Sequence, residues 1–123
     1  MTAESFVKAL APLLKAHGFK KSHATWRRSQ EESIAVLNIQ KSSWSSGEFF
    51  VNLGVYFCVF GELTAPTEYK CHVRRRLDVE APPEVVDKAM AWFDARARLA
   101  DAARLAQADA NHGLVAWQVR AAG

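Results

Sequence analysis

The sequence predicts an α+β fold, in which an N-terminal helix precedes a four-stranded antiparallel meander sheet and a long C-terminal helical segment packed on one face. Apolar residues occupy every odd position from Phe49 to Val59, a period of two that is typical of a strand with one buried face. Neighbouring strand-like stretches are joined to it by loops of hairpin length, which indicates antiparallel pairing. After Pro82 and Pro83 the apolar spacing becomes helical.

A chain of 123 residues has the length of one domain, and we expect residues 1–123 to fold as one. This length is enough to bury a core without metals or disulfides. No run of ~18 apolar residues occurs and the N-terminus lacks a signal pattern, so we expect no membrane association. The two cysteines form no disulfide framework, which favours a cytoplasmic location.

The formal net charge is +3, and the basic residues are unevenly distributed. No acidic residue occurs between Glu4 and Glu31, and Arg74 to Arg76 form a second basic cluster. The basic residues of the first stretch are Lys8, Lys15, Lys20, Lys21, Arg27 and Arg28. This distribution is either ordinary solvated charge or a patch for an anionic partner.

The N-terminal helix is expected to begin after Thr2, whose hydroxyl can accept a free backbone N–H. Its apolar residues recur at helical spacing: Phe6, Val7, Leu10, Leu13 and Leu14. Pro12 lies inside this pattern and predicts a kink near Ala11. Gly18 is expected to end the helix in a left-handed conformation.

Four strands are expected at residues 22–29, 33–42, 48–60 and 69–77. The helical pattern that follows is about 40 Å long if it continues to Asn111, so we expect it to overhang the sheet or to bend into two pieces. Asp94 and Arg98 have the spacing of an ion pair on one helix. Beyond this helix, Val115, Trp117 and Val119 alternate as in a short edge strand.

The apolar patterns also predict the register of the sheet. Leu37 is expected opposite Leu53, and Val73 opposite Phe57. The second face of the sheet then carries polar and basic side chains: Asn38, Gln40, Asn52, Tyr56, His72, Arg74 and Arg76.

This second face has two interpretations. It is either the solvated side of a two-layer sandwich or a binding surface. Phe50, Tyr56 and Phe60 are large for a solvated surface, so we expect a helix or a ligand to cover part of it. Trp44, in a serine-rich loop, is expected to fold over the sheet edge or to serve as an interface contact.

No motif of metal binding, cofactor binding or catalysis occurs in the sequence, so we expect no metal, no cofactor and no catalytic residue. Cys71 and His72 are adjacent in a predicted strand and therefore point to opposite faces. Cys58 and His72 are cross-strand neighbours in the predicted register. They form a weak candidate for a thiol–imidazole pair, and a structural role for both is favoured.

Several of these segments resemble the bacterial domain of unknown function family 4304. They are residues 18–21, 25–28, 36–44 and 50–55, and the similarity extends through residues 71–74. The sequence Asn-Ile-Gln-Lys-Ser-Ser-Trp at residues 38–44 is the most specific part. The resemblance implies a small α+β domain and brings no established activity, cofactor or catalytic residue.

Three functions therefore remain open. The favoured one is a non-enzymatic binding or protein-interaction module that uses the polar and basic sheet face, with a protein or a small anionic or polar ligand as partner. The second is nucleic-acid binding, because basic and aromatic side chains share one sheet face. The third is a small enzyme, which needs a cleft with two convergent titratable groups. The oligomeric state is left open.

Overall fold

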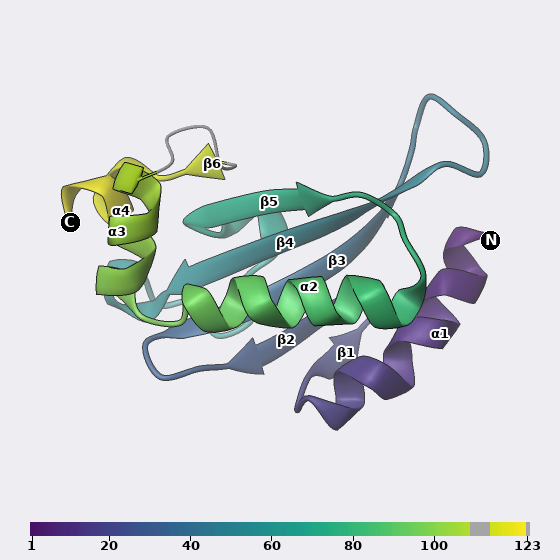
Figure 1. Cartoon of the computed structure of the whole chain (residues 1–123), viewed down its shortest axis with the longest axis horizontal. Coiled ribbons are helices and arrows are strands. Elements are labelled where there is room, and N and C mark those ends of the chain that lie inside the picture. Colours follow the sequence, from purple (N-terminus) through teal and green to yellow (C-terminus); the bar gives the residue numbers. More distant parts are fainter. Residues whose placement is uncertain (109–113, 123) are drawn as a thin grey trace.

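The computed structural model describes residues 1–108 and 114–122 and consists of a sheet with helices on one of its faces (Figure 1). Each strand pairs antiparallel with the next along the chain. The strands are β1 (Lys20–Ser22), β2 (Thr25–Ser29), β3 (Ser33–Lys41), β4 (Phe49–Phe57), β5 (Val73–Leu77) and β6 (Leu114–Val115). The helices are α1 (Ala3–Ala16), α2 (Pro82–Ala95), α3 (Leu99–Ala108) and α4 (Trp117–Ala121), with short 3₁₀ turns η1 (Cys58–Phe60) and η2 (Glu68–Lys70) before β5.

The α+β prediction is confirmed, and the described part of the sheet has six strands rather than four. The strand expected at residues 22–29 is a hairpin, β1–β2, whose turn contains His23 with a positive φ of 57°. Turns of this kind usually contain glycine or asparagine. Because neither residue is present here, the sequence did not predict the hairpin. The sixth strand, β6, pairs with β5.

Helix α1 begins and ends as its sequence predicts. The Thr2 hydroxyl accepts a hydrogen bond from the Ser5 N–H at 3.1 Å. The helix remains continuous through Pro12. Gly18 adopts a φ of 85°, and the Phe19 N–H donates to the Leu14 carbonyl at 3.1 Å, which closes the helix and turns the chain toward β1.

The long C-terminal helical segment bends into two pieces, α2 and α3. The sheet fixes the position of the break between α2 and α3, because the buried Ser33 hydroxyl of β3 donates a hydrogen bond to the Ala97 carbonyl at 2.8 Å. The Glu32 carboxylate accepts the Leu99 N–H at the start of α3. The expected Asp94–Arg98 pair is therefore wrong, since Asp94 lies on α2 and Arg98 lies in the break before α3.

These two side chains pair elsewhere: Asp94 with Arg28 at 3.2 Å, and Arg98 with Glu31 at 2.6 Å. The expected end of the helix at residues 111–113 lies outside the described residues. Of the tail expected to form an edge strand, only Leu114–Val115 does so, and Trp117 begins α4.

Helices α1 and α2 cover one face of the sheet, here called the inner face (Figure 1). Leu53 and Val55 of β4 have no exposed surface there. The helices contribute large fully buried side chains to this core: Phe6, Leu10 and Leu14 from α1, and Val85 and Phe93 from α2. Each such side chain contributes about 1.5–3 kcal/mol on burial. The predicted inward phase is thus confirmed from Phe49 to Phe57, whereas Val59 lies in η1 and is 73% exposed.

The registers are confirmed for β3–β4, where Leu37 lies opposite Leu53. For β4–β5 the prediction was wrong by two residues, because Val73 lies opposite Val55 rather than Phe57. Strand β4 ends at Phe57 and the chain continues into η1, while β5 begins only at Val73, after η2. Residues 58–60 and 70–72, which the predicted register paired with each other, are therefore not strands. A shift of two residues leaves the side chains of β5 on their predicted faces. Cys71 precedes β5, and its predicted position on the inner face is wrong, because it packs beside Val36 and Tyr56 on the opposite face.

Candidate functional site

The face of the sheet opposite α1 and α2, here called the outer face, is half covered. The segment of residues 58–72, which contains η1 and η2, packs on it over a small second core formed by Ile34, Val36, Tyr56 and Cys71. Tyr56 is only 4% exposed, and its hydroxyl accepts the Leu63 N–H at 3.3 Å. A covering segment, rather than a helix or a ligand, therefore buries Tyr56, which is not available as a contact residue.

His72 also belongs to this covered half. Its Nδ1 accepts the Phe57 N–H at 3.0 Å, and its ring lies 4.7 Å from the Tyr56 ring and 5.2 Å from the Phe60 ring. Burial lowers the pKa of His72 below its ordinary value of 6.5. The imidazole is a neutral structural group that joins the end of β4 to the start of β5.

This environment predicts a pH dependence of stability. In the unfolded chain the pKa of His72 is about 6.5, and in the folded protein it is lower. The unfolded state therefore binds more protons below this pH, and the free energy of unfolding should fall as the pH drops from 7 toward 5. Urea unfolding at both pH values measures the effect.

The variant His72→Gln keeps an acceptor for the Phe57 N–H but has no titratable group, so its stability should depend less on pH. His17→Gln, which changes an exposed histidine, is the matched control and should keep the wild-type slope. If the free energy of unfolding of His72→Gln depended on pH as strongly as that of the wild type, His72 would be excluded as the source of the pH dependence.

The two cysteines do not form a catalytic arrangement with His72. Cys71 is buried, and burial raises the pKa of its thiol to about 12. Cys58 is exposed in η1, and no hydrogen bond joins it to His72 within the described ranges. The same ranges hold no group of three metal-ligating side chains.

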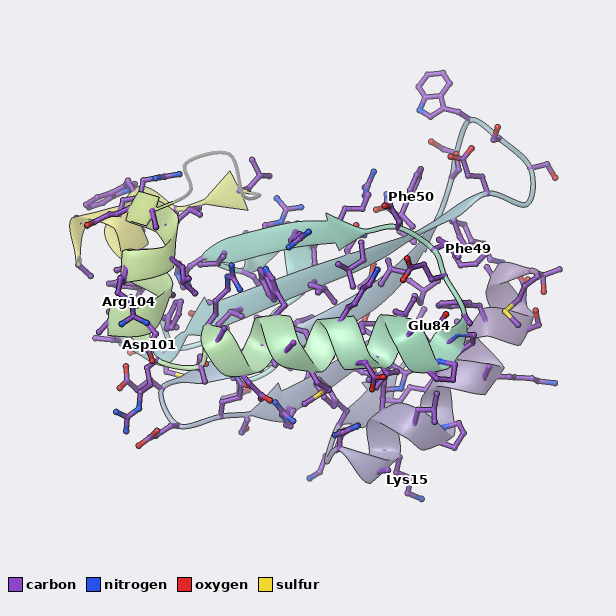
Figure 2. All side chains as sticks on the ribbon, in the orientation of Figure 1. Lys15, Phe49, Phe50, Glu84, Asp101 and Arg104 are labelled. Atoms are coloured by element: carbon purple, nitrogen blue, oxygen red, sulfur yellow. The ribbon has the colours of Figure 1, made fainter. Side chains whose placement is uncertain are left out.

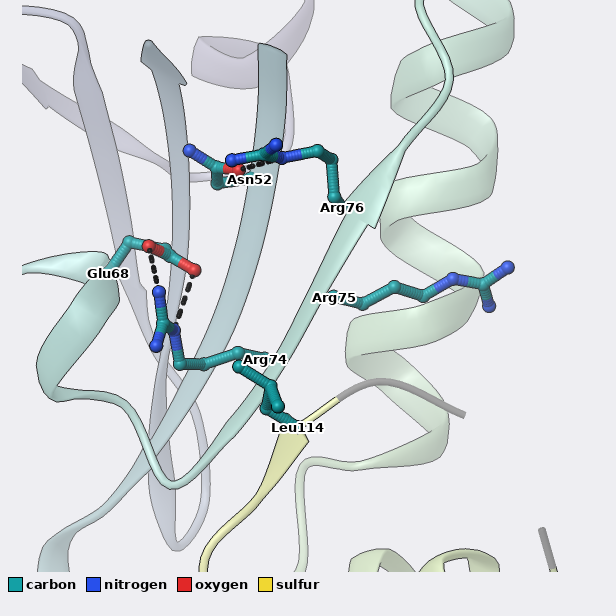
Figure 3. A pocket seen from close by; sticks show the side chains of 6 residues that line it. All are labelled: Asn52, Glu68, Arg74, Arg75, Arg76 and Leu114. Carbon is teal, nitrogen blue, oxygen red and sulfur yellow. Dashed lines mark hydrogen bonds and ion pairs between the residues drawn. The ribbon is translucent and has the colours of Figure 1, made fainter. Parts of the chain in front are cut away.

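Arg74 is neutralised by an acidic partner that the sequence did not reveal. Its Nε and Nη2 donate to the two oxygens of Glu68 at 3.0 and 3.2 Å (Figure 3). This hydrogen-bonded carboxylate raises the pKa of Arg74. Glu68 comes from η2, six residues earlier, and reaches Arg74 because η2 packs on the outer face.

The open half of the outer face carries a row of polar residues, here called the amide row. Its members Thr25, Asn38, Asn52 and Arg76 lie directly opposite one another on β2, β3, β4 and β5. The Asn38 amide donates to the Thr25 hydroxyl at 2.9 Å, and Arg76 Nε donates to Asn52 Oδ1 at 3.0 Å. Hydrogen bonds thus cross four strands.

Asn52 is the centre of the amide row and is only 5% exposed. Its amide group donates to Gln40 Oε1 at 2.9 Å and to Asn38 Oδ1 at 3.5 Å. With its carbonyl taken by Arg76, the side chain has no unused hydrogen-bonding group. Asn52 therefore orients its neighbours and does not itself reach a partner.

Arg76 is an exposed cation of the open half. Its guanidinium lies 4.1 Å from the centre of the Phe50 ring, and Asn52 fixes its Nε. No carboxylate of the described residues pairs with it. Figure 3 shows Arg74 and Arg76 on one side of β5 and Arg75 on the other, around a depression of about 270 Å³.

Trp44 is 96% exposed, so the prediction that it folds over the sheet edge was wrong. The loop that carries it joins β3 to β4 and projects beyond the sheet (Figure 1). The Ser42 hydroxyl accepts the N–H groups of Trp44 and Ser45, both at 3.1 Å, which gives the base of the loop a defined turn.

This loop leaves the sheet next to Gln40 and returns next to Phe50. Phe49 and Phe50 point to opposite sides of β4 (Figure 2), so Phe49 enters the core and Phe50 supports Arg76 on the outer face. The open surface is therefore formed by the amide row, Gln40, Phe50 and the Trp44 loop.

Of the eight residues predicted for the site, the structure joins Asn38, Gln40, Asn52 and Arg76 in one network. Tyr56 and His72 lie under the covering segment and are not part of the open surface, and Arg74 is paired with Glu68. Thr25 was missed, and Phe50 was predicted on this face but not as a site residue. Recognising the β1–β2 hairpin would have placed Thr25 opposite Asn38.

Residues 10–112 match the family model described as "Domain of unknown function (DUF4304)". No curated protein and no solved structure matches the chain significantly. Among residues 1–108 and 114–122, no helix is both long enough and apolar enough to cross a bilayer.

Proposed function

Since the chain belongs to the DUF4304 family, a domain family of unknown function, we propose a function from the site alone: a non-enzymatic protein-interaction module. Its contact surface is the open half of the outer face together with the Trp44 loop. The partner presents a carboxylate to Arg76. We take residues 1–123 as one domain for this purpose.

The observation that carries the proposal is the fixed orientation of Arg76. Asn52 holds Nε and the Phe50 ring supports one face of the guanidinium, while both Nη groups remain for a partner. Two parallel N–H groups fit a carboxylate in the bidentate mode. Because the side chain is already ordered, binding loses less conformational entropy than it does for a free arginine.

A protein partner is favoured over a small ligand by the shape of the surface. The depression beside Arg76 has a volume of about 270 Å³, below the ~300–1,000 Å³ of typical ligand pockets. The surface is open, and an exposed tryptophan stands at its margin. Trp and Arg are the residue types most enriched at the energetic centres of protein interfaces.

The free cysteines are consistent with a cytoplasmic setting for this module. Cys58 is an exposed thiol and Cys71 is a buried one, and neither has a disulfide partner. Such thiols persist in reducing compartments.

The proposal is tested by NMR with a tetraglutamate peptide as the carboxylate probe. The peptide should shift the signals of the Arg76 Nε–H, the Gln40 side-chain amide and the Trp44 indole N–H. Arg76→Gln should weaken binding at least about tenfold. Arg76→Lys keeps the charge but loses the planar fork, so it should weaken binding almost as much.

The matched control is Arg104→Gln. Arg104 pairs with Asp101 at 3.0 Å on α3, at the opposite end of the molecule (Figure 2), so its loss should leave binding unchanged. Equal weakening by Arg104→Gln, or full binding by Arg76→Gln, would contradict the proposal. If inorganic phosphate shifts the same signals and binds with higher affinity than the peptide, the ligand is a small anion instead.

A further inference from the structure

A second depression, of about 470 Å³, lies at the β1 edge of the sheet. We call it the β1 groove. Four of its lining side chains are cationic, Lys20, Lys21, Arg27 and Arg28, and none is acidic. Thr64 and Ala65 of the covering segment form part of its wall. The proposed interaction surface does not use this groove.

Two of these cations face each other in an arrangement that is unfavourable in the protein alone. Lys20 of β1 lies directly opposite Arg27 of β2, so both side chains stand on the outer face. Like charges at directly opposed positions destabilise a strand pair. Within residues 1–108 and 114–122, no carboxylate forms an ion pair with either of them.

The position of Arg27 is fixed by the covering segment. Its Nε donates to the carbonyl of the buried Pro66 at 2.7 Å, which leaves both Nη groups for other acceptors. Lys21 remains exposed, with its ammonium 5.7 Å from the Trp26 ring. Within the described residues, Arg28 is the only groove cation with an acidic partner, Asp94. The groove therefore keeps an excess of at least three positive charges.

The lining also limits the class of anion. A volume of about 470 Å³ lies in the range of small-molecule pockets. Among the described residues, no aromatic side chain lines the groove, although binding of single-stranded nucleic acid depends on bases stacked on aromatic rings. Arginine and lysine together are the usual ligands of phosphate oxygens.

We propose that the β1 groove binds a small phosphorylated molecule, with a phosphate group held between Lys20 and Arg27. The bound anion relieves the repulsion of the opposed pair. The groove lies four strands from Arg76, about 19 Å at 4.8 Å per strand. The two surfaces are thus separate, and the failure of one proposal leaves the other untouched.

Inorganic pyrophosphate is the probe for this site, with calorimetry for affinity and amide NMR for location. Wild-type protein should bind it and shift the amide signals of Lys20, Lys21 and Arg27. The double variant Lys20→Gln/Lys21→Gln should bind at least about tenfold more weakly. Both positions are exposed on a short edge strand, so the fold should persist, and circular dichroism verifies this.

The matched control is Lys8→Gln/Lys15→Gln, which removes the same charge from exposed positions on α1, where Lys15 projects away from the sheet (Figure 2). Its affinity should stay within about twofold of wild type. Thr64→Asp places a carboxylate on the groove wall without altering β1 and should also abolish binding.

Three results would overturn the proposal. The first is the absence of pyrophosphate binding at millimolar concentration. The second is an equal loss of affinity in the α1 control, which would indicate a general charge effect. The third is tight binding of a single-stranded oligonucleotide with no response to pyrophosphate, which would assign the groove to nucleic acid.

Discussion

Gly54→Ala is expected to lower the free energy of unfolding by about 1–3 kcal/mol, although it adds only one methyl group. Gly54 lies on β4 under the covering segment. A Cβ there would stand 2.6 Å from Cys71 Sγ and 2.7 Å from Cys71 Cβ. Both atoms are held in the buried second core, so the segment must shift to make room.

Urea unfolding monitored by circular dichroism measures this effect. Cys71→Ala should not rescue Gly54→Ala, because the Cys71 Cβ remains in the way, whereas Cys71→Gly should recover part of the loss. The comparison therefore needs the three single variants and the two double variants. A Gly54→Ala protein as stable as wild type would mean that residues 58–72 are not packed tightly on the sheet.

Gly61→Ala should be destabilising to a similar extent, about 1–3 kcal/mol. Its backbone is extended, with φ of −178°, a conformation that any residue adopts, so the effect is purely steric. A Cβ at this position would overlap the Tyr56 hydroxyl. The Tyr56 ring is buried and cannot swing aside without disturbing the second core.

Tyr56→Phe should rescue Gly61→Ala. Removing the hydroxyl leaves Cζ as the nearest atom, at 3.1 Å, at the loss of one hydrogen bond from the Leu63 N–H worth about 1 kcal/mol. The double-mutant cycle should give a favourable coupling of at least about 1 kcal/mol. Strictly additive effects in urea unfolding would show that the two residues do not meet.

Both variants bear on function because they test whether the covered half of the outer face is fixed. If residues 58–72 are held on the sheet by close packing at Gly54 and Gly61, then Tyr56 and His72 stabilise the fold and do not contact a partner. The binding surface is then restricted to the amide row, Phe50 and the Trp44 loop. The His72 pH dependence gives an independent measure of the same packing.

The α+β class, the β3–β4 register and the inward phase of Leu53 and Val55 followed from local patterns. The β1–β2 hairpin did not, because His23 adopts its positive φ without a glycine or asparagine signal. The β4–β5 register was missed because a continuous alternating pattern ran past Phe57, where the chain turns into η1.

The sequence by itself determined which side chains share a face within β3, β4 and β5, since alternation along a strand is a local property of the backbone. It therefore placed Asn38, Gln40, Asn52 and Arg76 together. Only the tertiary structure decided which polar groups remain free for a partner. The contacts that cover Tyr56 and neutralise Arg74 come from residues 61–68, a loop that shows neither helical nor strand spacing, and its packing depends on steric fit at Gly54 and Gly61.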